Sequence, residues 1–180
     1  MSVGHWGSSP TVREGVFPER ECSGVNALAN ALLHCFGVIH RARTTMSLKV
    51  GDTASLTKTI TDADIRAFAE LSGDDNPIHL DDEFAATTRF GRRIAHGMLA
   101  ASMISTVLGT KLPGIGTVHL SQNSQFMAPV YPGDTVTARV KVMKIRADKP
   151  IVTLETICEN QNGEVLIKGE AVVLAPWQVG

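Results

Sequence analysis

The alternation of hydrophobic and polar residues becomes regular at Met46, and it first predicts a strand followed by a helix. Positions 53–60 (TASLTKTI) alternate with a period of two, which is typical of a strand with one buried face. Thr61 is a good N-cap residue with two aspartates in the turn after it, so we expect a helix to begin here and to end at Gly73. The predicted apolar face of this helix carries Ile65, Phe68, Ala69 and Leu71.

The middle of the chain predicts a second and more hydrophobic helix. Residues 81–88 are typical of a short helical turn. The run 97–112 (GMLAASMISTVLGTKL) is apolar or small on every side, without a charge before Lys111. A helix that is hydrophobic all round is buried rather than amphipathic. We therefore expect 97–112 to be a central helix enclosed by other elements.

The C-terminal third predicts antiparallel strands. Runs with strand-like patterns lie at 118–129, 135–145, 151–158 and 165–174. Asn162-Gly163 predicts a type I′ hairpin between the last two strands. A long buried helix beside an antiparallel sheet must be covered by that sheet. The predicted fold class is therefore α+β, a hot-dog-like arrangement in which an antiparallel sheet wraps around the long buried helix.

The composition and the net charge argue against several classes of protein function. Hydrophobic residues make up 43% of the 180 positions and charged residues 19%, which excludes wholesale disorder. A formal net charge of −1 argues against an electrostatic nucleic-acid binder, so we expect no nucleic-acid partner. Cys22, Cys35 and Cys158 lie far apart and form no CxxC pair. We interpret them as free thiols of a reducing compartment rather than as a disulfide framework or a zinc site.

Residues 1–45 differ from the rest of the chain. We interpret them as an N-terminal extension, disordered or loosely attached, before a domain of residues 46–180. The apolar run 25–39 is too short to cross a bilayer, so we expect no membrane partner. The expected location is the cytoplasm. The mitochondrial matrix is the alternative, because the four arginines of this segment are typical of a mitochondrial presequence. Its three glutamates argue against one.

The densest cluster of reactive residue types lies just after the first predicted helix, from Asp74 to His79. Pro77 disfavours an unbroken helix across this segment, so we expect the chain to turn through Asn76-Pro77. Such a turn could bring the Asp74 carboxylate and the His79 imidazole to one small volume, where they could hold a water and act as an acid/base pair. The alternatives are that Asp74 only caps a turn and that His79 is an ordinary, partly buried histidine. A metal site built from the acids of this loop is less favoured than a solvated face.

The second cluster opens the central helix. The Gly97 N–H lies at the helix N-terminus and could donate to a carbonyl oxygen, although Gly97 could equally serve only tight packing. We expect His96 to be structural and to anchor the preceding loop. Ser105 either bonds a carbonyl within its own helix or lines the site. Leu108, three residues on, is predicted to share its face and could shape an acyl pocket.

These residues resemble the signature of a known family. The motif comprises 68–79 (FAELSGDDNPIH), Ala85 six residues later, the HGM run at 96–98, and Gly133-Asp134 before a long strand. It resembles the MaoC-like (R)-specific enoyl-CoA hydratases, in the same order over about Leu48 to Pro176. The resemblance implies a hot-dog fold, a homodimer, and reversible syn addition of water to a trans-2-enoyl-CoA, giving the (R)-3-hydroxyacyl-CoA.

The resemblance also implies roles for the individual residues of this chain that match the family's motif. Asp74 and His79 would position and activate the water, and the residues alone do not decide which of them moves which proton. The Gly97 N–H would bind the thioester carbonyl oxygen. Ser105 matches a site-lining serine, and Asn76 matches an asparagine that holds the loop. No metal or redox cofactor is implied, since the CoA or acyl-carrier pantetheine thioester is the substrate.

Three other functions remain open from the sequence. One is a 3-hydroxyacyl-acyl-carrier-protein dehydratase of fatty-acid synthesis, which would use the same residues in the reverse net direction. Another is a hot-dog thioesterase, which the intact DxNPxH motif disfavours. The third is a non-catalytic acyl-binding module, which would be expected to lose Asp74 or His79, whereas this chain keeps both.

Overall fold

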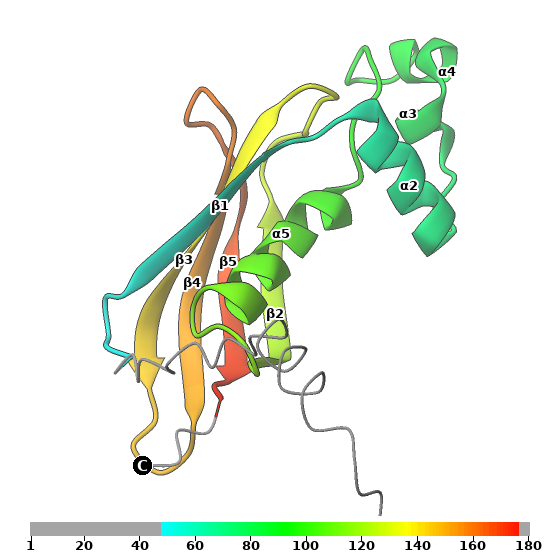
Figure 1. Cartoon of the computed structure of the whole chain (residues 1–180). Coiled ribbons are helices and arrows are strands. Elements are labelled where there is room, and N and C mark those ends of the chain that lie inside the picture. Colours follow the sequence, from blue (N-terminus) through cyan, green and yellow to red (C-terminus); the bar gives the residue numbers. More distant parts are fainter. Residues whose placement is uncertain (1–47, 177–180) are drawn as a thin grey trace, which may run out of the picture. The chain divides into compact units, whose positions relative to one another are not determined.

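A curved antiparallel sheet lies against one side of a central helix, α5, and three short helices lie beyond one end of that helix (Figure 1). This computed structural model describes residues 48–176. The helices are α2 (Asp62–Ser72), α3 (Pro77–Leu80), α4 (Asp82–Ala86) and α5 (Gly97–Thr110). The strands are β1 (Thr53–Thr59), β2 (Val118–Phe126), β3 (Thr135–Ile145), β4 (Ile151–Glu159) and β5 (Val165–Leu174). The five strands follow the order β1-β3-β4-β5-β2, and the predicted fold class is confirmed. The predicted extension, 1–45, lies outside the described residues.

Helix α2 begins and ends as its sequence predicts. The Thr61 hydroxyl accepts the Asp64 N–H at 3.1 Å, and the Asp64 carboxylate accepts the Thr61 N–H at 2.9 Å, so the two residues form a capping box. The Thr61 N–H, with Lys58 as a second donor, lowers the pKa of Asp64 to about 2. Gly73 ends the helix with a φ of 75°, and its N–H donates to the Ala69 carbonyl at 2.8 Å.

The expected apolar face of α2 is wrong at one position. Ile65 and Ala69 are four residues apart and are both buried, whereas Leu71 is 85% exposed. A residue two positions after Ala69 lies about 200° further round the helix, so Leu71 points to the opposite side.

Helix α5 is buried on one side only. Its inner face carries Ala100, Met103, Ile104, Val107 and Leu108. Its other face is exposed at Met98 and at four hydroxyl-bearing residues: Ser102, Ser105, Thr106 and Thr110. The expectation that α5 is enclosed on every side is therefore wrong for a single chain, because the five-stranded sheet covers only one face.

The sheet supplies the other half of an aliphatic core. Along β3 and β4 the buried positions alternate, so every second side chain faces α5, as the sequence pattern predicts. Cys158 is one of these core residues; it is a free thiol, and burial raises its pKa to about 12. Cys22 and Cys35 lie outside the described residues. Within residues 48–176, no helix has both the length and the hydropathy that crossing a membrane would require.

The β4–β5 hairpin is present, but its predicted turn type is wrong. A type I′ turn needs a positive φ at both central residues. Among the described residues only glycines have a positive φ, and here that residue is Gly163 at 78°. The Gly163 N–H donates to the Asn160 carbonyl at 3.0 Å, so Gly163 is the last residue of the turn. The strand register shifts just before this turn, between Cys158 and Glu159. The Asn160 side chain selects this turn, because its oxygen accepts the Asn162 and Glu164 N–H groups at 3.0 Å.

Candidate active site

Asp74 and His79 meet at the end of α2, as the sequence predicts. The Asn76 side chain accepts the Ile78 N–H at 3.1 Å and so caps α3. Pro77, which we expected only to stop a helix, is the first residue of this short one, a position that suits its fixed φ and missing N–H. The turn places one side-chain ligand atom each of Asp74, His79 and His96 within 4.8 Å of one another.

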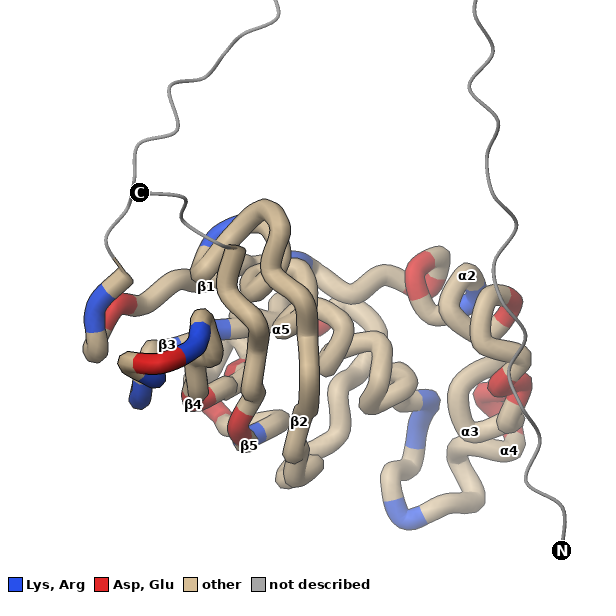
Figure 2. The backbone as a smooth tube through the Cα atoms, turned by 90° about the horizontal axis from the view of Figure 1, so that it is seen from below, with Lys and Arg blue, Asp and Glu red and all other residues tan. Residues whose placement is uncertain are grey.

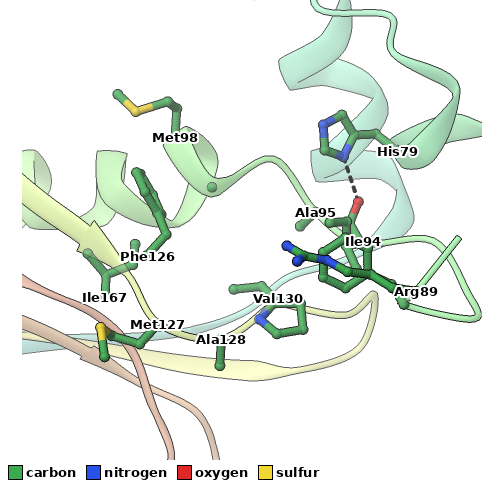
Figure 3. A pocket seen from close by; sticks show the side chains of 13 residues that line it. His79, Arg89, Ile94, Ala95, Met98, Phe126, Met127, Ala128, Val130 and Ile167 are labelled. Atoms are coloured by element: carbon green, nitrogen blue, oxygen red, sulfur yellow. Dashed lines mark hydrogen bonds between the residues drawn. The ribbon is translucent and has the colours of Figure 1, made fainter.

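The His79 imidazole is held in a defined orientation. It is buried, and its Nδ1–H donates to the Ile94 carbonyl oxygen at 2.8 Å (Figure 3). Because a carbonyl can only accept, this contact assigns the proton of the neutral ring to Nδ1. The Nε2 atom is then left with a free lone pair, which makes it the basic atom of the ring.

His96 contacts both members of the pair. It is only 2% exposed, and its Nε2–H donates to the Asp74 backbone carbonyl at 2.9 Å. Its ring lies 3.8 Å from the His79 ring, centroid to centroid, and 5.0 Å from the Phe68 ring. Nδ1 of His96 has no hydrogen-bond partner among the described residues. A histidine packed between two rings and tied to the backbone has the anchoring role that the sequence predicts for His96.

The Asp74 carboxylate is more open than either histidine. The side chain is exposed, and one of its oxygens accepts the Asn76 N–H over a long 3.4 Å. Asp74 therefore does cap this turn, as the alternative interpretation predicts, but through this one long hydrogen bond. The carboxylate keeps further lone pairs that can accept hydrogen bonds from a water or a ligand.

A cavity of about 400 Å³ opens beside His79 and the first residue of α5, Gly97. Figure 3 shows its walls, which come from the loop before α5 on one side and from the segment after β2 on the other. Most of the lining is apolar, with Phe90, Met98, Phe126, Met127, Val130 and Ile167 among the larger side chains. The histidine and the helix N-terminus therefore face a space suited to an apolar ligand.

Gly97 brings a hydrogen-bond donor to this cavity. The first N–H of a helix has no acceptor within the helix, and the positive end of the helix dipole lies there. The Phe126 ring packs directly against the Gly97 backbone: a Cβ added at Gly97 would lie 2.8 Å from the nearest ring carbon. Glycine thus permits a close ring contact at a residue that also lines the cavity.

Of the predicted site residues, only His79 and Gly97 line the cavity; Asp74, next to His79, and the remaining three do not. Asn76 is exposed and caps α3. Ser105 is exposed on the open side of α5, and Leu108 is fully buried in the core, so the prediction that they share a face is wrong. Their side chains point to different environments because the sheet covers only one side of the helix. Within one chain, the proposed contact of Leu108 with an acyl group has no support.

Sequence reasoning did not identify the wall formed by residues 126–130. These residues are the last residue of β2 and the four that follow it, and they lie about thirty positions after Gly97 in the chain. The Ala95 N–H donates to the Val130 carbonyl at 2.7 Å and joins this wall to the loop before α5. No local motif marks such a contact. The Ile94 carbonyl that orients His79 was missed for the same reason.

Known proteins match this chain over the part that carries the site. The family described as "MaoC like domain" matches residues 47–161. An (R)-specific enoyl-CoA hydratase of Aeromonas caviae is 52% identical over 130 residues, which are 72% of this chain and 97% of that protein. One of Rhodospirillum rubrum is 51% identical, covering 72% and 89%. A mitochondrial 3-hydroxyacyl-acyl-carrier-protein dehydratase of Arabidopsis thaliana is 40% identical, covering 72% and 78%. The solved structure of the A. caviae (R)-hydratase has a TM-score of 0.71 and covers 73% of this chain and 99% of its own.

Proposed function

The chain belongs to the family of MaoC-like domains, and on that premise we propose that it is an (R)-specific enoyl-CoA hydratase. The reaction is the reversible addition of water to a trans-2-enoyl-CoA, which gives the (R)-3-hydroxyacyl-CoA. One observation carries the proposal. His79, which has a free basic nitrogen, lines an apolar cavity together with Gly97, the first residue of α5, and an oxygen of the Asp74 carboxylate lies within 4.8 Å of a nitrogen of the His79 ring.

The pair suits the activation of one water molecule. We assign the role of base to Nε2 of His79, since Nδ1 already holds its proton on the Ile94 carbonyl. The Asp74 carboxylate accepts a second hydrogen bond from the same water and orients it. As the water oxygen attacks C3 of the enoyl group, its proton passes to the pair, and one proton returns from the pair to C2. The net reaction of these two proton transfers and the attack is the addition of one H₂O across the double bond.

The helix N-terminus suits the charge that develops during the attack. Electron density moves from the C2–C3 double bond onto the thioester oxygen. The Gly97 N–H can donate to this oxygen, and the positive end of the α5 dipole lies there as well. The apolar wall excludes water from the rest of the acyl group. These residues would supply acid/base and electrostatic catalysis.

We expect the purified protein to hydrate crotonyl-CoA, measured as the loss of the enoyl-thioester absorbance. Crotonyl-acyl-carrier protein, assayed in parallel, tests the second candidate, which the similarity to the A. thaliana dehydratase supports. A strong preference for the carrier-protein thioester would contradict the CoA assignment. Release of free thiol without loss of the double bond would instead indicate a thioesterase.

We also propose that the enzyme is a homodimer that forms along β2. This strand is at the edge of the sheet, and eight of its nine residues are exposed. Three of its exposed side chains are large and apolar, Val118, Leu120 and Phe126, and so is that of Met127 just after it. It carries no Lys, Arg, Asp or Glu, as its uniformly tan tube in Figure 2 shows. Such an edge is a template for pairing with another strand, and a second copy would satisfy its backbone and also cover the open face of α5.

A charge in the middle of β2 is expected to separate the two copies. In a fully paired antiparallel dimer of β2 the central Gln122 meets its own copy, and Asn123 lies diagonally opposite the second Asn123 on the same face of the sheet. Asn123→Lys would therefore bring two positive charges near each other. We expect the wild-type protein to sediment as a dimer and Asn123→Lys to sediment near the chain mass of 19.3 kDa. Val50→Lys, at an exposed apolar residue outside β2, is the matched control and should remain dimeric. A wild-type protein with the mass of one chain would contradict the proposal.

A further inference from the structure

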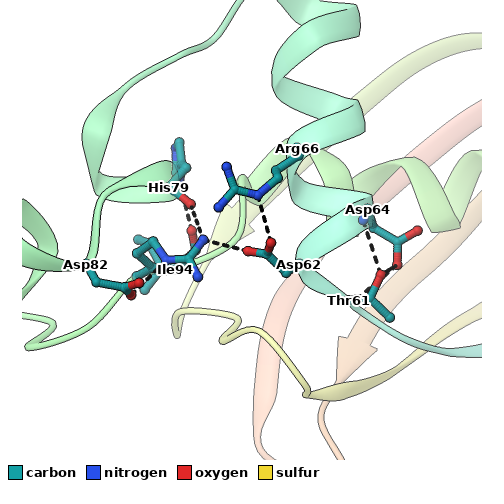
Figure 4. A network of polar contacts seen from close by, with 8 residues as sticks. Thr61, Asp62, Asp64, Arg66, His79, Asp82 and Ile94 are labelled. Atoms are coloured by element: carbon teal, nitrogen blue, oxygen red, sulfur yellow. Dashed lines mark hydrogen bonds and ion pairs between the residues drawn. The ribbon is translucent and has the colours of Figure 1, made fainter.

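Arg93 is a nearly buried cation that the reaction itself does not use. Its side chain is 13% exposed and lies in the loop between α4 and α5. Nη1 lies 2.6 Å from the Asp62 carboxylate, and Nε lies 2.8 Å from the Asp82 carboxylate (Figure 4). Both carboxylates, Asp82 more strongly, raise the pKa of the guanidinium above its usual value.

The two carboxylates belong to the elements that carry the catalytic pair. Asp62 is the first residue of α2, and the end of that helix leads into Asp74. Asp82 is the first residue of α4, which directly follows the short helix that carries His79. One guanidinium therefore joins the loop before α5 to both of the segments that supply the acid/base pair.

The same loop determines how the His79 ring is oriented. Nη1 of Arg93 lies 3.5 Å from the His79 backbone carbonyl, and the residue after Arg93 is Ile94. The Ile94 carbonyl accepts the Nδ1–H of His79 at 2.8 Å, and the Ile94 N–H donates to the Ile78 carbonyl at 3.3 Å. A displacement of this loop would therefore move the acceptor that fixes both the direction and the tautomer of the imidazole.

We propose that Arg93 is a positioning residue: its guanidinium holds the loop before α5 against α2 and α4, and thereby fixes the carbonyl that orients His79. The consequence for catalysis rests on the proposed hydratase function. The effect on the imidazole does not, because it concerns the free protein.

The first test is Arg93→Met, which keeps the apolar stem and removes both ion pairs. We expect kcat for crotonyl-CoA to fall by about 10- to 100-fold, as for other small displacements of a catalytic group, with KM changed less than about two-fold. Arg66→Met is the matched control. Arg66 binds the same Asp62 carboxylate at 2.7 Å but is 56% exposed and lies outside the loop, so its loss should change kcat less than about two-fold.

The second test separates positioning from a general structural role. If Arg93 acts through His79, Arg93→Met should lower kcat less than about two-fold when it is introduced into His79→Gln, because the two residues then act as a unit. An equal loss in both backgrounds would overturn the proposal. So would a lower melting temperature with an unchanged kcat in the single variant.

The third test does not depend on turnover. In the wild-type protein, the ¹⁵N resonances of the His79 ring should show a protonated Nδ1 and an unprotonated Nε2. We expect Arg93→Met to populate both tautomers and Arg66→Met to retain one. An unchanged spectrum in Arg93→Met would overturn the proposal even if the protein proved inactive on crotonyl-CoA. If the spectrum changed in Arg93→Met but the wild-type protein were inactive on crotonyl-CoA, the positioning role of Arg93 would stand and only the hydratase function would be contradicted.

A milder variant covers the case in which Arg93→Met does not fold. Asp82 is 78% exposed, so Asp82→Asn removes one of the two ion pairs at little cost to the core. We expect a smaller loss of kcat, about three- to ten-fold, together with a partial change in the His79 spectrum. No change in either measurement would overturn the proposal.

Discussion

Replacing His79 with glutamine, or Asp74 with asparagine, is expected to lower kcat for crotonyl-CoA by about 10²- to 10⁴-fold, the range for loss of a general acid or base. Glutamine is a polar side chain of similar size, but it has no basic nitrogen to take a proton from water. Asparagine keeps the size of Asp74 and removes its charge. Stopped-flow or steady-state absorbance, with circular dichroism to verify folding, measures the effect.

Asp75→Asn is the matched control for Asp74→Asn. It removes the adjacent exposed carboxylate from the same loop and should leave kcat within about two-fold of the wild type, as expected of a surface charge. If Asp74→Asn or His79→Gln kept a near-normal rate, the assignment of the water-activating pair would be wrong. If Asp75→Asn were equally damaging, the charge of the whole loop, and not the geometry of the pair, would matter.

The second large effect is expected at Gly97, where the chain allows the removal of a single N–H. Proline is well tolerated as the first residue of a helix. The preceding His96 has a ψ of 130°, a backbone conformation that is compatible with a following proline. Gly97→Pro should therefore preserve α5 while deleting the proposed donor to the thioester oxygen. We expect kcat to fall by about 10²- to 10³-fold relative to Gly97→Ala, as for the loss of one oxyanion donor.

Gly97→Ala is the reference because it adds the same Cβ as proline and keeps the N–H, which proline replaces with the Cδ of its ring. Both variants place a Cβ 2.8 Å from the Phe126 ring, so both require that exposed ring to move. Only proline also removes the N–H. Equal rates in the two variants would show that the thioester oxygen is bound elsewhere, and an alanine variant with the wild-type rate would show that the ring moves freely.

Several features of this protein follow from the sequence because their causes are local. The capping box at Thr61, the left-handed Gly73 and the turn through Pro77 each depend on residues within a few positions of one another. The alternation along β3 and β4 reports directly which side chains face the core. For this reason the strands, the end of α2 and the proximity of Asp74 to His79 were all predictable.

Other features depend on which surfaces meet in space. The composition of α5 shows that the helix is apolar, but only the position of the sheet decides that one face stays open, with Ser105 exposed and Leu108 buried. The wall of the cavity after β2 approaches Gly97 through backbone contacts between segments about thirty residues apart.

The sequence by itself determined the order of the elements, the fold class and the proximity of Asp74 to His79, since periodicity, capping and turn formation act over a few residues. Only the tertiary structure decided which nitrogen of His79 is free, because that depends on a carbonyl fifteen residues away. It alone also showed that one guanidinium joins the three segments around the site. Contacts of this kind depend on how the sheet curves and where the loops close, and no pattern along the chain records that geometry.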